Sequence, residues 1–156
     1  MIGKSPVVFF VFRRPELTAK VFDAIRIYRP EKLVLVADGA RDSKVGELEL
    51  VQQTRRILDQ VDWPCEVFRD FAERNIGLRN RILTGLDFAF QHVDQAIILE
   101  DDCLPTSDFF RFASEMLDTF EDRDEIGLIS GSNFSPYKGR FDLHFSKSPY
   151  IWGWAT

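Results

Sequence analysis

The sequence is poor in the residues that build disulfide frameworks and zinc sites. It has two cysteines, Cys65 and Cys103, and two histidines, His92 and His144, among 156 residues. Two cysteines form no disulfide framework, and neither belongs to a C-x-x-C pair, so their spacing does not favour a structural zinc site. We expect buried or half-buried thiols in a reducing compartment, which indicates a cytoplasmic protein.

Long apolar runs and blocks of basic charge are missing as well. The longest apolar runs, such as Val7–Phe12, and shorter ones such as Ala96–Leu99 are far below the ~20 residues of a membrane span. The first residues lack the apolar segment of a signal peptide. With 20 basic against 25 acidic side chains, a net charge of −5 and no basic block, the composition argues against general nucleic-acid binding.

Apolar side chains are nevertheless abundant enough to fill a core. Hydrophobic residues make up 45% of the chain, with 15 phenylalanines. Short apolar runs alternate with segments of helical period, which predicts a mostly parallel sheet covered by helices. We expect one domain over residues 1–156. The expected strands are Val7–Phe12, Leu33–Ala37, Cys65–Phe68, Ala96–Leu99 and Ile126–Ser130.

Four segments between or after these strands have the apolar spacing of amphipathic helices. The first begins at Pro15 and is ended by Pro30, and the fourth is capped by residues of Thr106–Asp108. The expected inward positions are Leu17, Val21, Ala24, Ile25 and Tyr28; Leu50, Val51, Ile57, Leu58 and Val61; Leu78, Ile82, Leu86, Ala89 and Phe90; and Phe109, Phe112, Ala113, Met116 and Phe120. From about residue 131 the pattern changes, and apolar residues alternate at Phe141, Leu143 and Phe145.

Acidic residues follow two of the expected strands. Open parallel sheets bind ligands beyond the carboxyl ends of their strands, so these positions matter most. Asp38 with Gly39 either caps a turn or accepts a hydrogen bond from a base or ribose. The triplet Glu100-Asp101-Asp102 is either a solvated acidic turn or a site for Mg²⁺ or Mn²⁺ that bridges a nucleotide diphosphate.

Two further segments have both a structural and a functional interpretation. The segment Arg74–Asn80, with Asn75 as a cap and Gly77 allowing close approach, is either an ordinary capped helix start or an anion site. Arg13 and Arg14 are solvated loop charges or phosphate contacts. The aromatic rings of Trp152 and Trp154 either pack in the core or lie against a sugar ring.

Taken in order, these segments resemble the nucleotide-binding part of a GT-A glycosyltransferase. Within that fold the chain is most similar to bacterial proteins of the N-acetylglucosaminyltransferase I-like kind and neighbouring family 2 enzymes. The resemblance spans nearly the whole chain. Its matching segments are Pro6–Pro15, Val36–Gly39, Asn75–Asn80, Ile98–Asp102 with Pro105 and Asp108–Phe110, and Trp152–Trp154.

The resemblance implies a three-layer Rossmann-like α/β fold with a mostly parallel central sheet, truncated at its C-terminus. It implies that Asp102 holds a divalent metal, Mn²⁺ or Mg²⁺, against the donor diphosphate. Glu100 and Asp101 would contact ribose or donor-sugar hydroxyls, and Asp38 the uracil base or ribose. Arg79 would lie near the nucleotide, and Trp152 and Trp154 on the acceptor side.

The implied reaction is inverting transfer of a sugar from a nucleoside diphosphate, UDP in the first instance, to a glycan or other acceptor hydroxyl. In related enzymes the catalytic base follows the Trp-Gly-Trp segment, so we expect it beyond Thr156 and assign neither Asp142 nor His144. Two alternatives stay open. One is a non-catalytic nucleotide-sugar-binding or interaction module, and the other is a sugar-phosphate nucleotidyltransferase, which usually needs a glycine-rich loop where this chain has Phe12–Pro15.

Overall fold

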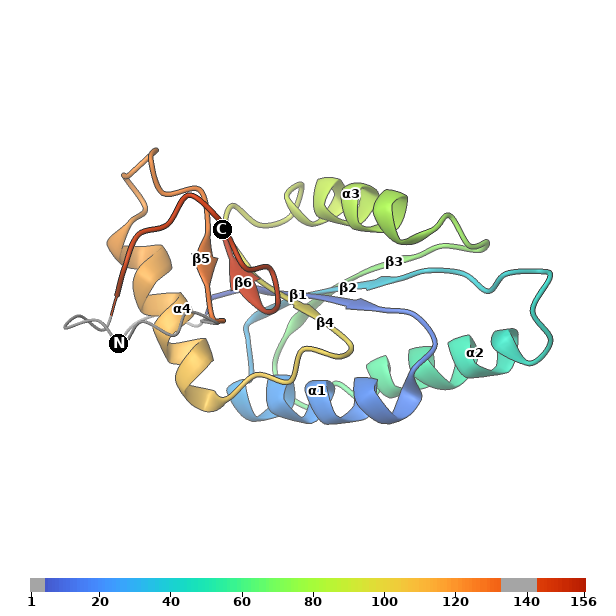
Figure 1. Cartoon of the computed structure of the whole chain (residues 1–156). Coiled ribbons are helices and arrows are strands. Elements are labelled where there is room, and N and C mark those ends of the chain that lie inside the picture. Colours follow the sequence, from blue (N-terminus) through green and yellow to red (C-terminus); the bar gives the residue numbers. More distant parts are fainter. Residues whose placement is uncertain (1–4, 133–142) are drawn as a thin grey trace.

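The computed structural model describes residues 5–132 and 143–156, which form an α/β structure (Figure 1). Strands and helices alternate along most of this part of the chain. In order they are β1 (Val7–Val11), α1 (Pro15–Tyr28), β2 (Lys32–Ala37), α2 (Glu47–Leu58), β3 (Glu66–Phe71), α3 (Leu78–Ala89), β4 (Ile97–Glu100), α4 (Ser107–Thr119), β5 (Ile129–Ser130) and β6 (Trp154–Ala155).

The strands form one sheet in the order β3-β2-β1-β4-β6-β5. Strands β1 to β4 are parallel, whereas β6 is antiparallel to both β4 and β5. The chain leaves β1 towards β2 and β3 and later returns to the other side of β1 with β4. This reversal opens a crevice at the carboxyl ends of β1 and β4, the usual ligand position in such sheets.

Helices cover both faces of the sheet. Figure 1 shows α3 on one side and α1 and α2 on the other. One core cluster joins inward residues of α1, α2 and α4, such as Phe22, Leu58 and Phe110, to one face of the strands. The second cluster packs α3 residues, including Ala89, on the opposite face. The predicted three-layer α/β architecture with a mostly parallel sheet is confirmed.

The predicted strands are confirmed in position; the ends of β1, β2 and β4 differ from the prediction by one residue, and β3 and β5 differ by more. All five residues of β1 are buried, as a continuous apolar run predicts for a central strand. The third strand is Glu66–Phe71 rather than Cys65–Phe68, because it pairs with β2 along the full stretch Lys32–Ala37. The fifth strand is Ile129–Ser130 rather than Ile126–Ser130, since β6 offers it two partner residues.

The helices also begin and end close to the predicted residues. Helix α1 starts at Pro15 and ends before Pro30, with Arg29 in the left-handed conformation at φ 56°. In α4 the Thr106 hydroxyl accepts a hydrogen bond from the amide of Phe109 at 3.2 Å, as the capping pattern predicts. The side chain of Asn75 does not cap α3, because its amide group bonds to Asp38 and Gly39 instead.

The inward faces of all four helices differ in part from the prediction. Leu17 of α1 and Leu50 of α2, each at 38% exposure, and Leu78 at 72% lie outside the core, as does Phe90, which follows the end of α3. In α4 the buried residues centre on Phe110, which stacks on Tyr28 at 4.3 Å between ring centroids. The predicted Phe109, Phe112 and Met116 lie at the margin of that cluster.

The residues after 131 are described in part. Phe141 and Asp142 lie outside the described residues, while Leu143 and Phe145 are exposed at 42% and 75%. Residues 143–156 include strand β6, in which Trp154 pairs with Ile98 of β4. The helices of the described ranges are too short or too polar to cross a membrane.

Candidate functional site

A pocket of about 270 Å³ lies at the carboxyl ends of β1, β2 and β4, beside the start of α3. This is the crevice at which the strand order reverses. The pocket contains three of the predicted site residues, Asp38, Glu100 and Asp101, together with residues that no motif indicated. The lining is Phe10, Val11, Phe12, Arg14, Asp38, Arg41, Asn75, Gly77, Leu78, Arg81, Ile82, Glu100 and Asp101.

Asp38 holds the loop that leads into α3 through hydrogen bonds to its side-chain carboxylate. Its carboxylate is buried, and its Oδ1 accepts hydrogen bonds from the amides of Gly39 at 2.9 Å and Ile76 at 3.0 Å. Its Oδ2 accepts from the Asn75 side-chain amide at 2.9 Å and the Gly77 amide at 3.1 Å. A carboxylate has about four acceptor positions, so the protein itself fills those of Asp38.

Two glycines permit the close packing of this loop. A Cβ on Gly39 would lie 2.4 Å from the carbonyl carbon of Arg74, closer than atoms of folded proteins approach. Gly77 has φ 84°, a conformation that favours glycine, immediately before the first residue of α3. The hydrogen bonds to Asp38 and the lack of a side chain at the two glycines therefore hold this loop in place as one wall of the pocket.

The acidic triplet begins at the last residue of β4 and faces the loop after β1. Asp101 is buried at 5% exposure, and its Oδ2 accepts a hydrogen bond from the Phe12 amide at 3.2 Å. Its Oδ1 lies 3.4 Å from an Arg14 nitrogen. Asp102 is half exposed and accepts a hydrogen bond from the same Arg14 guanidinium.

Burial and repulsion between carboxylates raise the pKa values of two residues in this turn, Glu100 and Asp101. Burial raises the pKa of Glu100, and the charges of Asp102 and Asp101 raise it further, with Arg14 opposing. Burial also raises the pKa of Asp101, against the effects of Arg14 and the Phe12 amide. Three carboxylates therefore gather around one arginine, an arrangement to which a divalent cation would bring the missing positive charge.

The donor set fits a metal that is shared with a ligand rather than enclosed by protein. Within residues 5–132 and 143–156, no three side chains of Cys, His, Asp or Glu are placed to hold a metal by themselves. Mg²⁺ and Mn²⁺ commonly take one or two carboxylates and complete their shell with water and phosphate oxygens. The half-exposed carboxylate of Asp102, which accepts a hydrogen bond from Arg14, is the member of the triplet that such a site could use.

A buried glutamate, Glu47, joins the loops after β1 and β2. It is 2% exposed at the first residue of α2 and forms ion pairs with Arg13 at 2.7 Å and Arg41 at 2.6 Å. The two guanidinium groups lie 5.5 Å and 5.8 Å from the ring centroid of Phe12. Hydrogen bonding from Arg41 lowers the pKa of Glu47 to about 2, so the carboxylate stays charged and keeps Arg41 at the pocket.

Arg81, rather than the predicted Arg79, is the arginine of α3 that lines the pocket. It is 6% exposed and forms an ion pair with Asp70 of β3. Arg79 is exposed on the same helix. A helix turns about 100° per residue, so two positions along the helix separate a pocket-facing side chain from a solvent-facing one. No sequence signal distinguished the two arginines.

The two tryptophans of the tail have different surroundings. Trp154 is partly buried and packs against the cluster beneath α3, as the core interpretation predicted. Trp152 is 58% exposed. Gly153 between them has φ 72°, which turns the chain so that Trp154 enters the sheet.

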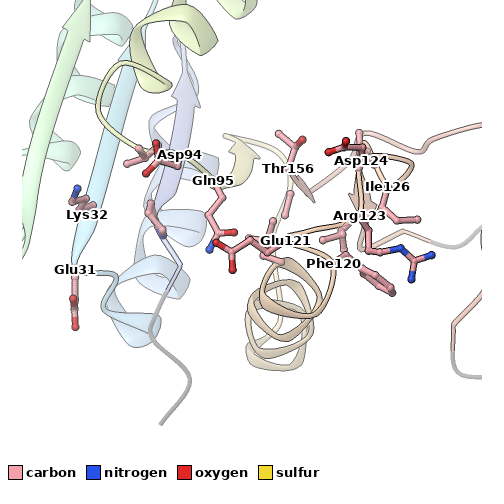
Figure 2. A pocket seen from close by; sticks show the side chains of 16 residues that line it. Glu31, Lys32, Asp94, Gln95, Phe120, Glu121, Arg123, Asp124, Ile126 and Thr156 are labelled. Carbon is pink, nitrogen blue, oxygen red and sulfur yellow. The ribbon is translucent and has the colours of Figure 1, made fainter.

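A second pocket, of about 560 Å³, lies at the opposite end of the sheet. Figure 2 shows its lining beside the amino-terminal end of β2 and the segment after α4, with Asp94, Gln95 and Thr156 among the labelled side chains. No predicted site residue lies there. The predicted site residues in the smaller pocket and the larger pocket therefore lie at opposite ends of the parallel strands.

Comparison with known proteins indicates the fold. No family model and no curated protein matches the sequence. The structure is similar to the mannosyltransferase PcManGT from Pyrobaculum calidifontis, solved in complex with GDP-Man and Mn²⁺, with a TM-score of 0.53 and 17% identity. The match covers 83% of this chain and 35% of that chain, so the chain spans about a third of its neighbour's length. At this identity the likeness shows the fold alone, a Rossmann-like α/β arrangement shared with that enzyme.

Proposed function

We propose that this chain forms the donor-binding part of a metal-dependent glycosyltransferase. The observation that carries the proposal is the pocket at the carboxyl ends of β1, β2 and β4, which Glu100 and Asp101 line and which Asp102 directly follows in the chain. The structural neighbour, which was solved with a nucleotide sugar and Mn²⁺, supports the same type of ligand. The donor would be a nucleoside diphosphate sugar, UDP-linked in the first instance, and the acceptor a hydroxyl group.

The acidic triplet, of which Glu100 and Asp101 line the pocket, would orient the donor. Glu100, Asp101 and Asp102 carry three formal negative charges against the one positive charge of Arg14. Asp102 would hold Mn²⁺ or Mg²⁺ together with the diphosphate, because its carboxylate is the most exposed of the two in contact with Arg14. A metal bound there would stabilise the charge that develops on the leaving diphosphate.

Arg14 would then exchange its contact with Asp102 for a contact with the donor phosphate. Its guanidinium contacts Asp101 and Asp102, and a metal on Asp102 would free it for a phosphate oxygen. Glu100 and Asp101 remain our proposed contacts for ribose or donor-sugar hydroxyls. Trp152, exposed near the end of the chain, is proposed with Trp154 on the acceptor side.

Asp38 is proposed to act on the nucleotide chiefly through the loop that it holds. A direct bond from a base or ribose to Asp38 would require one of its four protein donors to leave. Arg79 is exposed near the start of α3 and would reach only the outer part of a bound nucleotide. Inverting transfer of the sugar completes the proposal.

Thermal unfolding with UDP, with and without Mn²⁺, tests this function. A ligand at about 100 times its Kd stabilises a folded chain by about 2.7 kcal/mol, so a clear rise in Tm is expected when both are present. Asp102→Ala should lose the Mn²⁺-dependent part of the rise. Asp94→Ala, an exposed carboxylate at the opposite pocket, is the matched control and should keep it. A rise that is the same in all three proteins would refute the metal role of Asp102.

A further inference from the structure

One nitrogen atom of Arg14 lies between two carboxylates of the acidic triplet. This atom, Nη1, donates a hydrogen bond to Oδ2 of Asp102 and lies 3.4 Å from Oδ1 of Asp101. The other oxygen of Asp102 has the thiol of Cys103 at 3.8 Å, and a thiol is a weak donor. A second cation could therefore reach Asp102 only beside the Arg14 guanidinium or in its place.

The two contacts of Arg14 differ in how readily they can be exchanged. The side chain of Asp101 is 6% exposed, and it also accepts a hydrogen bond from the Phe12 amide at 3.2 Å. The side chains of Arg14 and Asp102 are 50% and 45% exposed, so water and ligands reach both. Ion pairs between side chains this exposed are weak. The Asp102 contact can therefore open while Asp101 stays in place.

The backbone on either side of Arg14 is held in place. Before it, Arg13 donates a hydrogen bond to the buried carboxylate of Glu47 at 2.7 Å. After it, Pro15 begins α1, and a residue that precedes proline is restricted to extended conformations; Arg14 has φ −119°. Opening of the Asp102 contact is therefore a rotation of the Arg14 side chain rather than a movement of the loop.

We propose that Arg14 is an internal counter-cation that occupies Asp102 until a nucleoside diphosphate binds, so that metal and nucleotide bind this chain together rather than separately. The charge of Arg14 opposes a divalent cation at Asp102 in the free chain. Phosphate oxygens of the nucleotide accept the displaced guanidinium, so each ligand strengthens the binding of the other. This inference rests on the proposed function, because it requires the metal at Asp102 and the diphosphate beside it.

The test is the Mn²⁺ affinity of the full chain, measured by electron paramagnetic resonance with and without UDP. In Arg14→Gln the affinity without UDP should rise by about fivefold or more, the upper range for a half-exposed ion pair. The factor by which UDP strengthens Mn²⁺ binding should fall by a similar amount, because no displaced guanidinium meets the phosphate. A residue that only supports the fold would not raise metal affinity when it is replaced.

Three further variants separate a direct effect of Arg14 from one of folding or net charge. Arg14→Ala is a second neutral variant and should show the same gain, even where Arg14→Gln fails to fold. Arg14→Lys keeps a positive charge, so its Mn²⁺ affinity without UDP should stay close to that of the wild type. Arg13→Gln removes the same charge from the neighbouring residue, whose partner is Glu47, and should change the affinity by no more than about twofold, because solvent and salt screen a charge that contacts neither carboxylate.

Each outcome decides between the two proposals. Unchanged or weaker Mn²⁺ binding without UDP in a folded neutral variant of Arg14 overturns the role of Arg14 and leaves the proposed function standing. An equal gain in Arg13→Gln also overturns that role, because the effect would then be one of net charge. Absence of any Mn²⁺-dependent binding of UDP to the wild type overturns the proposed function and this inference together.

Discussion

Replacing Asp38 with asparagine should destabilise the loop that leads into α3. The Asp38 carboxylate accepts four hydrogen bonds, from three backbone amides and the Asn75 side chain, and it is 5% exposed. Asparagine keeps one oxygen and places an NH₂ group against two of these four donors. Turning the Asn75 amide to meet that group would break its bond to the Gly39 carbonyl.

The size of the effect follows from the donors left without a partner. Each buried donor without an acceptor costs about 1–3 kcal/mol, so we expect Asp38→Asn to lower the free energy of unfolding by about 2–4 kcal/mol. For a chain of this length, about 3 kcal/mol corresponds to a fall in Tm of roughly 6–12 °C. Nucleotide binding should weaken as well, because the pocket wall moves with the loop.

Equilibrium unfolding in urea, followed by circular dichroism, measures the change. Asp42→Asn is the matched control, since Asp42 is exposed in the loop after β2, and its effect should stay within about 0.5 kcal/mol. If Asp38→Asn were as stable as the wild type and yet lost nucleotide affinity, the four hydrogen bonds of Asp38 would not be what holds the loop. Asp38 would then act on the ligand directly.

Two further variants test the packing and the charge network around the pocket. Gly85→Ala should lower the free energy of unfolding by about 1–3 kcal/mol, because a Cβ there would lie 2.5 Å from Phe10 Cε1 and 2.6 Å from Val36 Cγ1; Gly127→Ala, with open space around it, should be neutral. In Glu47→Gln the loss of stability should be full above about pH 4.5 and should disappear as the pH falls towards about 2. The sign follows from the folded-state pKa of Glu47, which is lowered to about 2, so the carboxylate stabilises the fold only while it is charged. Urea unfolding between pH 2 and pH 7 measures this, and a constant difference across that range would contradict it.

Much of the fold could be predicted because it depends on local patterns. The continuous apolar run of β1 indicated burial on both faces, and Pro15 and Thr106 marked the first turns of α1 and α4. The predicted bounds were wrong where the length of a strand depends on the strand with which it pairs. The length of β3 depends on β2, and that of β5 depends on β6, which lies more than twenty residues later in the chain.

The site was only partly predictable for the same reason. Strand ends identified Asp38, Glu100 and Asp101 as pocket residues, since parallel topology brings those ends together. The contacts of Asp38 with residues 75–77 span 37 to 39 positions, and those of Glu47 with Arg13 span 34, which no motif reveals. Arg81 was missed because its burial depends on how α3 is rotated against β3.

Direct measurement of Mn²⁺ binding by electron paramagnetic resonance tests the central claim most sharply. We predict that UDP strengthens Mn²⁺ binding to the wild type, that Mn²⁺ strengthens UDP binding by the same factor, and that Asp102→Ala weakens Mn²⁺ binding in the presence of UDP by about tenfold or more. Asp94→Ala should behave as the wild type. Equal Mn²⁺ affinity in the wild type and Asp102→Ala, with UDP present, would contradict the account.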